Sequence, residues 1–249
     1  MRPQPSNGLK RDLRRQSIYL LPNMFTLAAL FAGFYAVVQA MNQRFEPAAV
    51  AIFIAMVLDG MDGRVARMTH TQSAFGAEFD SLSDMVSFGV APALVVYEWA
   101  LQGFGKLGWV VAFIYCAAAA LRLARFNTNI DVVDKRFFQG MPSPTAAALV
   151  AGLVWVSLEM GWQGEPLRWF ALGLTAFAGL TMVSNVRFYS FKEINVRKTV
   201  PFFVLVPLVF ALVAIAASPP VALFALFLSY GVSGYVHAAW RRLRPAAKP

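Results

Sequence analysis

Apolar residues dominate this chain in long runs, which short polar segments interrupt. Runs of spanning length lie at about 17–40, 48–68, 73–101, 107–125, 142–160, 168–186, 200–217 and 219–239. Each run approaches or exceeds the ~20 residues that an α-helix needs to cross about 30 Å of hydrocarbon. The pattern therefore predicts an all-α polytopic membrane protein with about eight transmembrane helices.

The composition supports this prediction. Of the 249 residues, 58% are hydrophobic and 14% are charged, which leaves too little polar surface to coat a soluble domain of this length. The single cysteine, Cys116, excludes an internal disulfide framework. We expect one membrane-embedded domain at residues 17–240, between basic cytoplasmic tails at 1–16 and 241–249.

The net charge of +9 is distributed unevenly across the predicted membrane. Eight spans place both termini on one side, and all but three of the 22 basic residues fall on that side. The three exceptions are Arg44, Lys106 and Arg168. Because cytoplasmic loops carry the excess of Lys and Arg, the termini are predicted to be cytoplasmic, in a bacterial-type inner membrane. The charge thus indicates topology and attraction to anionic lipid rather than nucleic-acid binding.

Four aspartates fall inside the second and third predicted spans, where ionisable residues are costly and usually functional. In the second span, helical spacing places one set on a single face: Asp59, Asp62, Gly63, Ala66 and Arg67. In the third span, the same spacing aligns Gly76, Asp80 and Asp84. If the chain turns near residue 71, position 59 lies level with 84 and position 62 with 80. The four carboxylates then converge in the cytoplasmic half of the membrane.

Four carboxylates in a poorly hydrated site require neutralisation. Arg64 and Arg67 supply at most two charges, and a set of oxygen ligands alone favours a hard cation such as Mg²⁺ or Mn²⁺, with Ca²⁺ as a further candidate. Two divalent cations balance four aspartates and attract a diphosphate, as in two-metal phosphoryl chemistry. The alternatives are a cation-coupled transporter or proton relay, and a structural ion-pair network.

Residues 59–84 resemble the signature of the CDP-alcohol phosphatidyltransferase family. That signature, D-x2-D-G-x2-A-R-x8-G-x3-D-x3-D, fits from Asp59 to Asp84 at every fixed position. The resemblance implies that Asp59, Asp62, Asp80 and Asp84 bind two divalent cations. It also implies that Asp84 is the base that activates the acceptor hydroxyl.

Segments outside the signature resemble the membrane-embedded phosphatidylserine synthases of this family. They lie at 22–26, 87–93, 121–127, 140–144 and 182–192. The resemblance implies transfer of phosphatidyl from CDP-diacylglycerol to L-serine with release of CMP, and a homodimer. Other acceptors remain open, namely glycerol 3-phosphate, inositol phosphate and choline. One departure is Ala29, where related sequences often carry asparagine.

By the same resemblance, the CDP-lipid site comprises Asn23, Thr26, Gly63, Arg67 and Ser73. Some of these side chains also have plain structural interpretations. Asn23 and Thr26 can satisfy the start of a membrane helix, and Ser73 can cap the third span, which is compatible with a binding role.

For the acceptor, the residues themselves suggest a cation. Serine carries a carboxylate, which an arginine can bind with two parallel hydrogen bonds. Arg122 and Arg125, at the cytoplasmic end of the fourth span, are therefore the candidate acceptor-binding residues. The alternative is that both arginines serve only to set topology. We expect neither His70 nor His237 to be a metal ligand.

Overall fold

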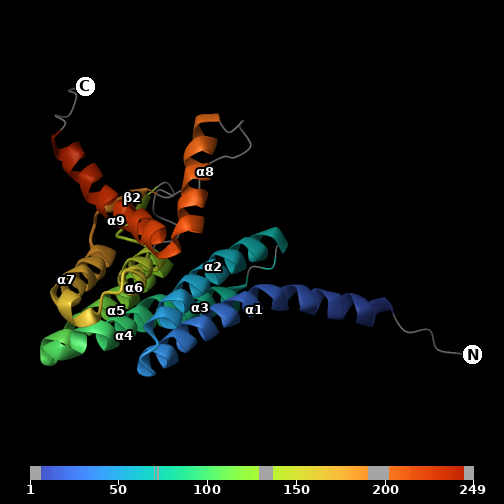
Figure 1. Cartoon of the computed structure of the whole chain (residues 1–249). Coiled ribbons are helices and arrows are strands. Elements are labelled where there is room, and N and C mark those ends of the chain that lie inside the picture. Colours follow the sequence, from blue (N-terminus) through green and yellow to red (C-terminus); the bar gives the residue numbers. More distant parts are fainter. Residues whose placement is uncertain (1–6, 70, 72, 129–136, 190–201, 244–249) are drawn as a thin grey trace, which may run out of the picture.

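The computed structural model describes residues 7–69, 71, 73–128, 137–189 and 202–243, and nearly all of them are helical (Figure 1). The first half contains α1 (Asn7–Met41), α2 (Phe45–Thr69), α3 (Ala74–Asp84), α4 (Ala91–Val96) and α5 (Lys106–Thr128). The second half contains α6 (Ser143–Glu159), α7 (Gly164–Val183), α8 (Phe202–Ala217) and α9 (Pro219–Leu243). The prediction of an all-α polytopic membrane protein is confirmed.

Each of the eight predicted spans coincides with a helical rod, although not every rod is long and apolar enough to qualify as a span by itself. Within the described residues, five segments qualify: Leu21–Met41, Ala74–Phe104, Lys106–Thr128, Gly164–Val183 and Pro219–Trp240. Helix α6 is apolar but shorter, and α2 carries the charged signature residues. The number of eight spans therefore stays a prediction. Helix α1 begins at Asn7, earlier than its predicted span.

Small side chains fill the contacts between helices, and large apolar ones point outward. Ala36, Ala40 and Ala48 are fully buried where α1 packs against α2. By contrast, Phe31 is 67% exposed and Phe113 is 63% exposed. Small residues allow helix backbones to approach closely in lipid, and a hydrocarbon solvent imposes no penalty on exposed phenylalanines. This distribution is the one expected for a bundle surrounded by acyl chains.

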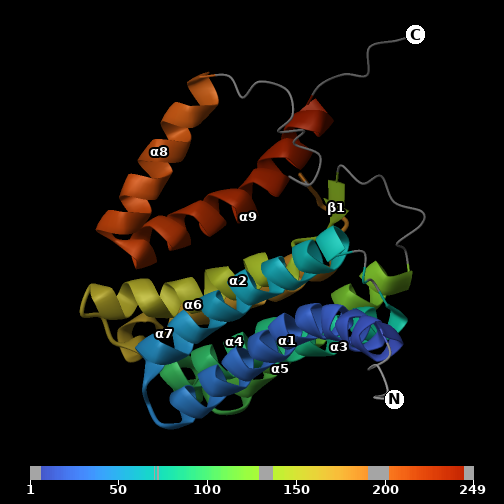
Figure 2. The ribbon, with the colours of Figure 1, turned by 90° about the vertical axis from the view of Figure 1, so that its right-hand side faces the viewer.

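Helix α6 is the central element of the bundle. Nearly every side chain from Ser143 to Ser157 is buried, because α6 packs against α2, α4, α7 and α9. Helix α9 lies along α6, and α8 packs against α9 while leaning away from the other helices (Figure 2). The helical hairpin of α8 and α9 is thus joined to the bundle through α9.

The third predicted span is one long rod with an irregular middle. Helix α3 passes directly into a π-helical turn, η1 (Met85–Val90), and continues through α4, the π-helical η2 (Tyr97–Leu101) and a short 3₁₀ turn, η3 (Gln102–Phe104). Just before η1, the Ser83 hydroxyl donates to the carbonyl of Thr26 at 3.1 Å; within η1, the Ser87 hydroxyl donates to that of Ala29 at 3.0 Å. A Cβ on Gly33 would lie 2.7 Å from the Cα of Ser87. The rod is therefore held tightly against α1 on both sides of Asp84.

A short antiparallel ribbon, which the sequence did not predict, joins β1 (Phe137–Gln139) to β2 (Arg187–Tyr189), with Phe138 opposite Phe188. The chain leaves β1 through Gly140, whose φ is +77° and whose N–H donates to the carbonyl of Val186 at 2.8 Å. A Cβ at Gly140 would lie 2.1 Å from the carbonyl oxygen of Met182. Only glycine fits this turn, which delivers the chain to the start of α6.

Candidate active site

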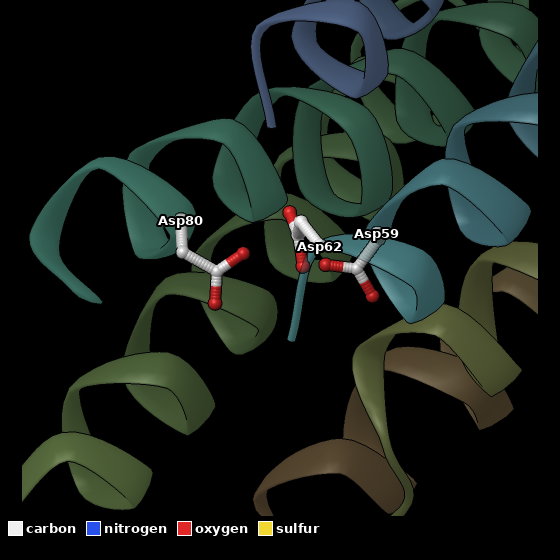
Figure 3. A group of neighbouring side chains, drawn as sticks. All are labelled: Asp59, Asp62 and Asp80. Atoms are coloured by element: carbon white, nitrogen blue, oxygen red, sulfur yellow. The ribbon is translucent and has the colours of Figure 1, made fainter. Parts of the chain in front are cut away.

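Three aspartates from two helices form a compact carboxylate group. Asp59 and Asp62 extend from α2 and Asp80 from α3, with their carboxyl groups turned toward one another (Figure 3). One oxygen from each lies within 4.8 Å of the others. Asp62 is buried at 5% exposure, whereas Asp59 and Asp80 are half-buried. The three carboxylates converge between α2 and α3, as the signature spacing predicts.

The fourth acid, Asp84, lies beside this group as the last residue of α3. Asp84 interacts with Asp59, and Asp80 interacts with both Asp59 and Asp62. The two pairs expected from a turn near residue 71 are therefore among these interactions. The π-helical turn starts at the next residue, Met85. Such turns often occur at functional sites, and nothing in the sequence pattern indicated this one.

The donor set suits a hard divalent cation. Oxygen is the ligand atom at every position, and Oδ1 of Asp80 is buried without a hydrogen-bond partner among the described residues. A buried carboxylate oxygen without a partner is costly, and so are carboxylates in mutual contact. A bound cation relieves both penalties. Asp59, Asp62 and Asp80 therefore fit a metal centre, and Asp84 adjoins this group through its interaction with Asp59.

Helix α1 supports the carboxylates through Thr26. Its buried hydroxyl lies 2.9 Å from Oδ2 of Asp62 and 3.2 Å from the carbonyl oxygen of Pro22, so its single hydrogen is shared between these two acceptors. Thr26 thus hydrogen-bonds its own helix as the structural interpretation expected, but inside α1 rather than at its start. Its bond to Asp62 also orients a carboxylate of the cluster, as outer-shell partners of metal ligands do.

The N-terminus of α3 brings together two more of the predicted residues. Ser73 caps this helix, because its hydroxyl accepts a hydrogen bond from the N–H of Gly76 at 3.0 Å. The side-chain oxygen of Asn23 lies beside the same glycine: a Cβ there would meet it at 3.4 Å. On α2, a Cβ at Gly63 would lie 3.6 Å from Nη1 of Arg67, whose side chain is exposed. Asn23, Ser73 and Gly76 thus form one small polar group at the end of the α2–α3 hairpin.

The two candidate acceptor arginines have different surroundings. The half-buried guanidinium of Arg122 interacts electrostatically with Asp59 and Asp84 and donates from Nη1 to the hydroxyl of Ser143 at 2.7 Å. Arg125 donates to the carbonyl of Val183 at 3.3 Å and to Asn185 Oδ1 at 3.4 Å. Arg122 therefore belongs to the surroundings of the aspartates, whereas Arg125 ties α5 to the end of α7.

A cleft of about 800 Å³ opens between α2, α6 and α9. Its polar lining includes Arg64 of α2, Thr145 of α6, and Ser229, Tyr230 and Ser233 of α9. Tyr230 also interacts electrostatically with Arg122, which connects the cleft to the surroundings of the aspartates. Sequence reasoning did not find this cleft or Tyr230, because the last two spans carry no recognisable motif.

Comparison with known proteins agrees with this geometry. Residues 19–182, more than half of the chain, match the CDP-alcohol phosphatidyltransferase family. This chain belongs to that family and is an integral membrane enzyme. The family uses divalent cations, and the group of Asp59, Asp62 and Asp80 has the geometry to hold one. Membership decides against the transporter alternative.

Several relatives share a single name, CDP-diacylglycerol–serine O-phosphatidyltransferase. The protein of that name from Helicobacter pylori strain J99 is 38% identical over 88% of this chain and 92% of its own length. The one from Mycobacterium tuberculosis strain H37Rv is 32% identical over 90% of this chain and 79% of its own. The archaeal protein from Methanocaldococcus jannaschii is 32% identical over 74% of this chain and 82% of its own length.

Proposed function

We propose that this enzyme transfers the phosphatidyl group of CDP-diacylglycerol to L-serine, giving phosphatidylserine and CMP. The observation that carries the proposal is the convergence of three signature aspartates, Asp59, Asp62 and Asp80, into one partly buried group. The names of relatives from bacteria and an archaeon support serine as the acceptor.

Asp59, Asp62, Asp80 and Asp84 would hold two divalent cations, Mg²⁺ or Mn²⁺ with Ca²⁺ as a further candidate. When bound, these cations would neutralise the diphosphate of the substrate and stabilise the attacking and leaving oxygens. Thr26 keeps the carboxylate of Asp62 in its binding orientation.

Asp84 takes the proton of the serine hydroxyl as attack begins. The serine oxygen then bonds to the phosphorus that carries diacylglycerol, and the bond from that phosphorus to the CMP oxygen breaks. CMP leaves with the electron pair of this bond, and the proton passes from Asp84 to water. Atoms and charge balance without another reactant.

The remaining predicted residues divide between the two substrates. Asn23, Gly63, Arg67 and Ser73 line the CDP side with Thr26, near the end of the α2–α3 hairpin. Arg122 binds the acceptor carboxylate, and its position beside Asp59 and Asp84 supports this role. The hydrogen bonds of Arg125 to the end of α7 favour a structural role for that arginine.

The site opens to the cytoplasmic leaflet of the inner membrane, within one membrane domain at residues 17–240. The charge distribution supports this orientation, since the basic residues gather on the side of the aspartates. Homodimerisation remains an implication of the resemblance.

The test is an assay of purified enzyme in detergent with radiolabelled serine. We expect label in lipid only when both CDP-diacylglycerol and Mn²⁺ or Mg²⁺ are present, with release of one CMP per lipid. EDTA should abolish the reaction. Preference for glycerol 3-phosphate over serine would contradict the acceptor assignment, and activity without metal would contradict the chemistry.

A further inference from the structure

Ser143 lies at the meeting point of three segments that are distant in sequence. It is the first residue of α6, it is fully buried, and its hydroxyl accepts the hydrogen bond from Nη1 of Arg122 on α5. Among the described residues, the hydrogen bond from Arg122 is the one that the Ser143 side chain makes. An effect of Ser143 on the reaction is therefore expected to pass through the guanidinium.

The backbone around Ser143 is fixed by its neighbours. Pro142 and Pro144 flank it, and both have restricted φ angles. Two residues before Ser143, Met141 donates its N–H to the carbonyl of Thr181 at 3.1 Å, and Gly140 donates its N–H to the carbonyl of Val186. The Ser143 hydroxyl therefore presents an acceptor at a defined point in the bundle.

This acceptor sets the orientation of the Arg122 side chain. The Ser143 bond occupies Nη1, and neither Nε nor Nη2 makes a hydrogen bond within the described part of the chain. Nε and Nη2 form one edge of the planar guanidinium, the edge that matches the two oxygens of a carboxylate. The Phe126 ring, 6.0 Å from the guanidinium carbon, lies against the same group.

We propose that Ser143 is a positioning residue that holds Arg122 with its free edge toward the carboxylate of the amino-acid acceptor. The inference rests on the proposed function, in which that acceptor is serine. The competing interpretation makes Arg122 a counter-charge for Asp59 and Asp84 only. In that case its orientation matters little, and the carboxylate of the substrate is recognised elsewhere.

Ethanolamine separates the two interpretations, since it is serine without the carboxylate. The measured quantity is the ratio of kcat/KM for serine to that for ethanolamine. Ser143→Ala should reduce this ratio about tenfold, the loss expected for one hydrogen bond of about 1.4 kcal/mol. Arg122→Lys should reduce it about 10–100-fold, because the planar fork is lost. The KM for CDP-diacylglycerol and the metal affinity should change less than about threefold in both variants.

Ser157→Ala is the matched control. Ser157 lies on the same helix and is equally buried, but its hydroxyl has no hydrogen-bond partner among the described residues. It should keep the wild-type ratio. The double variant Arg122→Lys/Ser143→Ala should discriminate no worse than Arg122→Lys alone, because Ser143 acts through the arginine.

Four outcomes would overturn the inference. In the first, Ser143→Ala has the same ratio of kcat/KM for serine to that for ethanolamine as Ser157→Ala, while the enzyme still uses serine; the proposed function then stands. In the second, Ser143→Ala raises the KM for CDP-diacylglycerol or weakens metal binding, which makes Arg122 a counter-charge for Asp59 and Asp84. If Ser143→Ala does not fold, an unchanged ratio in Arg122→Lys overturns the inference by itself. A wild type that incorporates no serine overturns the proposed function as well.

Discussion

Removing divalent cations should lower the thermal stability of this enzyme, and the geometry of the three-carboxylate group gives the scale of the effect. Two unit charges at the 4.8 Å limit of this group repel by about 3.5 kcal/mol at an effective dielectric constant of about 20. Three such pairs amount to about 10 kcal/mol, similar to the whole unfolding free energy of a typical domain. The metal-free protein must therefore take up protons or lose stability, whereas a bound cation turns repulsion into attraction.

The assay is thermal unfolding in detergent after EDTA treatment, followed by titration with Mn²⁺ or Mg²⁺. A cation at 100 times its Kd stabilises the folded state by about 2.7 kcal/mol, which corresponds to roughly 5–10 °C in Tm for a chain of this size. Asp80→Asn should melt at or above the metal-free wild type, because it removes charge from two of the three pairs. It should also lose most of the response to metal.

Glu78→Gln is the matched control, since Glu78 is exposed on the same helix, two residues from Asp80. It should keep both the wild-type Tm and the wild-type metal response. The reasoning is refuted if EDTA leaves the Tm of the wild type unchanged and neither cation raises it. It is also refuted if Asp80→Asn responds to metal as strongly as Glu78→Gln does.

Three further predictions concern single positions. Asp84→Asn should lower turnover about 10²–10⁴-fold, while nucleotide binding, measured by calorimetry, should change by at most about tenfold. A parallel loss of nucleotide binding would make Asp84 mainly a metal ligand. Thr26→Val should weaken metal affinity about 10–100-fold by freeing the Asp62 carboxylate, whereas Thr175→Val, which loses only a bond to its own helix, should not. Gly140→Ala should lower Tm by several degrees, since the φ of Gly140 is positive and an added Cβ would meet the Met182 carbonyl. Gly173→Ala is the control, and it should leave Tm unchanged because Gly173 has open space around it. Equal Tm values for the two variants would contradict the argument.

The sequence was most informative where function constrains the spacing of residues along a helix. The pairings of Asp59 with Asp84 and Asp62 with Asp80 followed from helical rise and a turn at residue 71, and the cap at Ser73 followed from its place before the third span. Both depend on one hairpin, whose geometry is local.

The arrangement of distant segments could not be predicted in this way. Helix α6 is apolar all round, so its sequence does not indicate which face meets α2, α7 or α9. The π-helical turn after Asp84 reflects packing of η1 against α1, where Gly33 allows the Ser87 backbone to approach. The position of Tyr230 beside Arg122 depends on how α9 lies on α6. These features depend on contacts between helices, which an apolar pattern specifies weakly.

Three segments that resemble the phosphatidylserine synthases outside the signature meet at one end of the bundle, and this convergence has a physical reason. Arg122 and Arg125 end α5, Gly140 leads into α6, and Val183 ends α7. Their mutual hydrogen bonds lock these three helix ends together: Arg122 to Ser143, Arg125 to Val183, and Gly140 to Val186. In the proposed function, the aspartates of α2 and α3 supply reaction chemistry that any alcohol acceptor needs. Discrimination among acceptors must then come from groups that differ in charge and shape beside those aspartates, and Arg122 is the cation that this locked end presents to them.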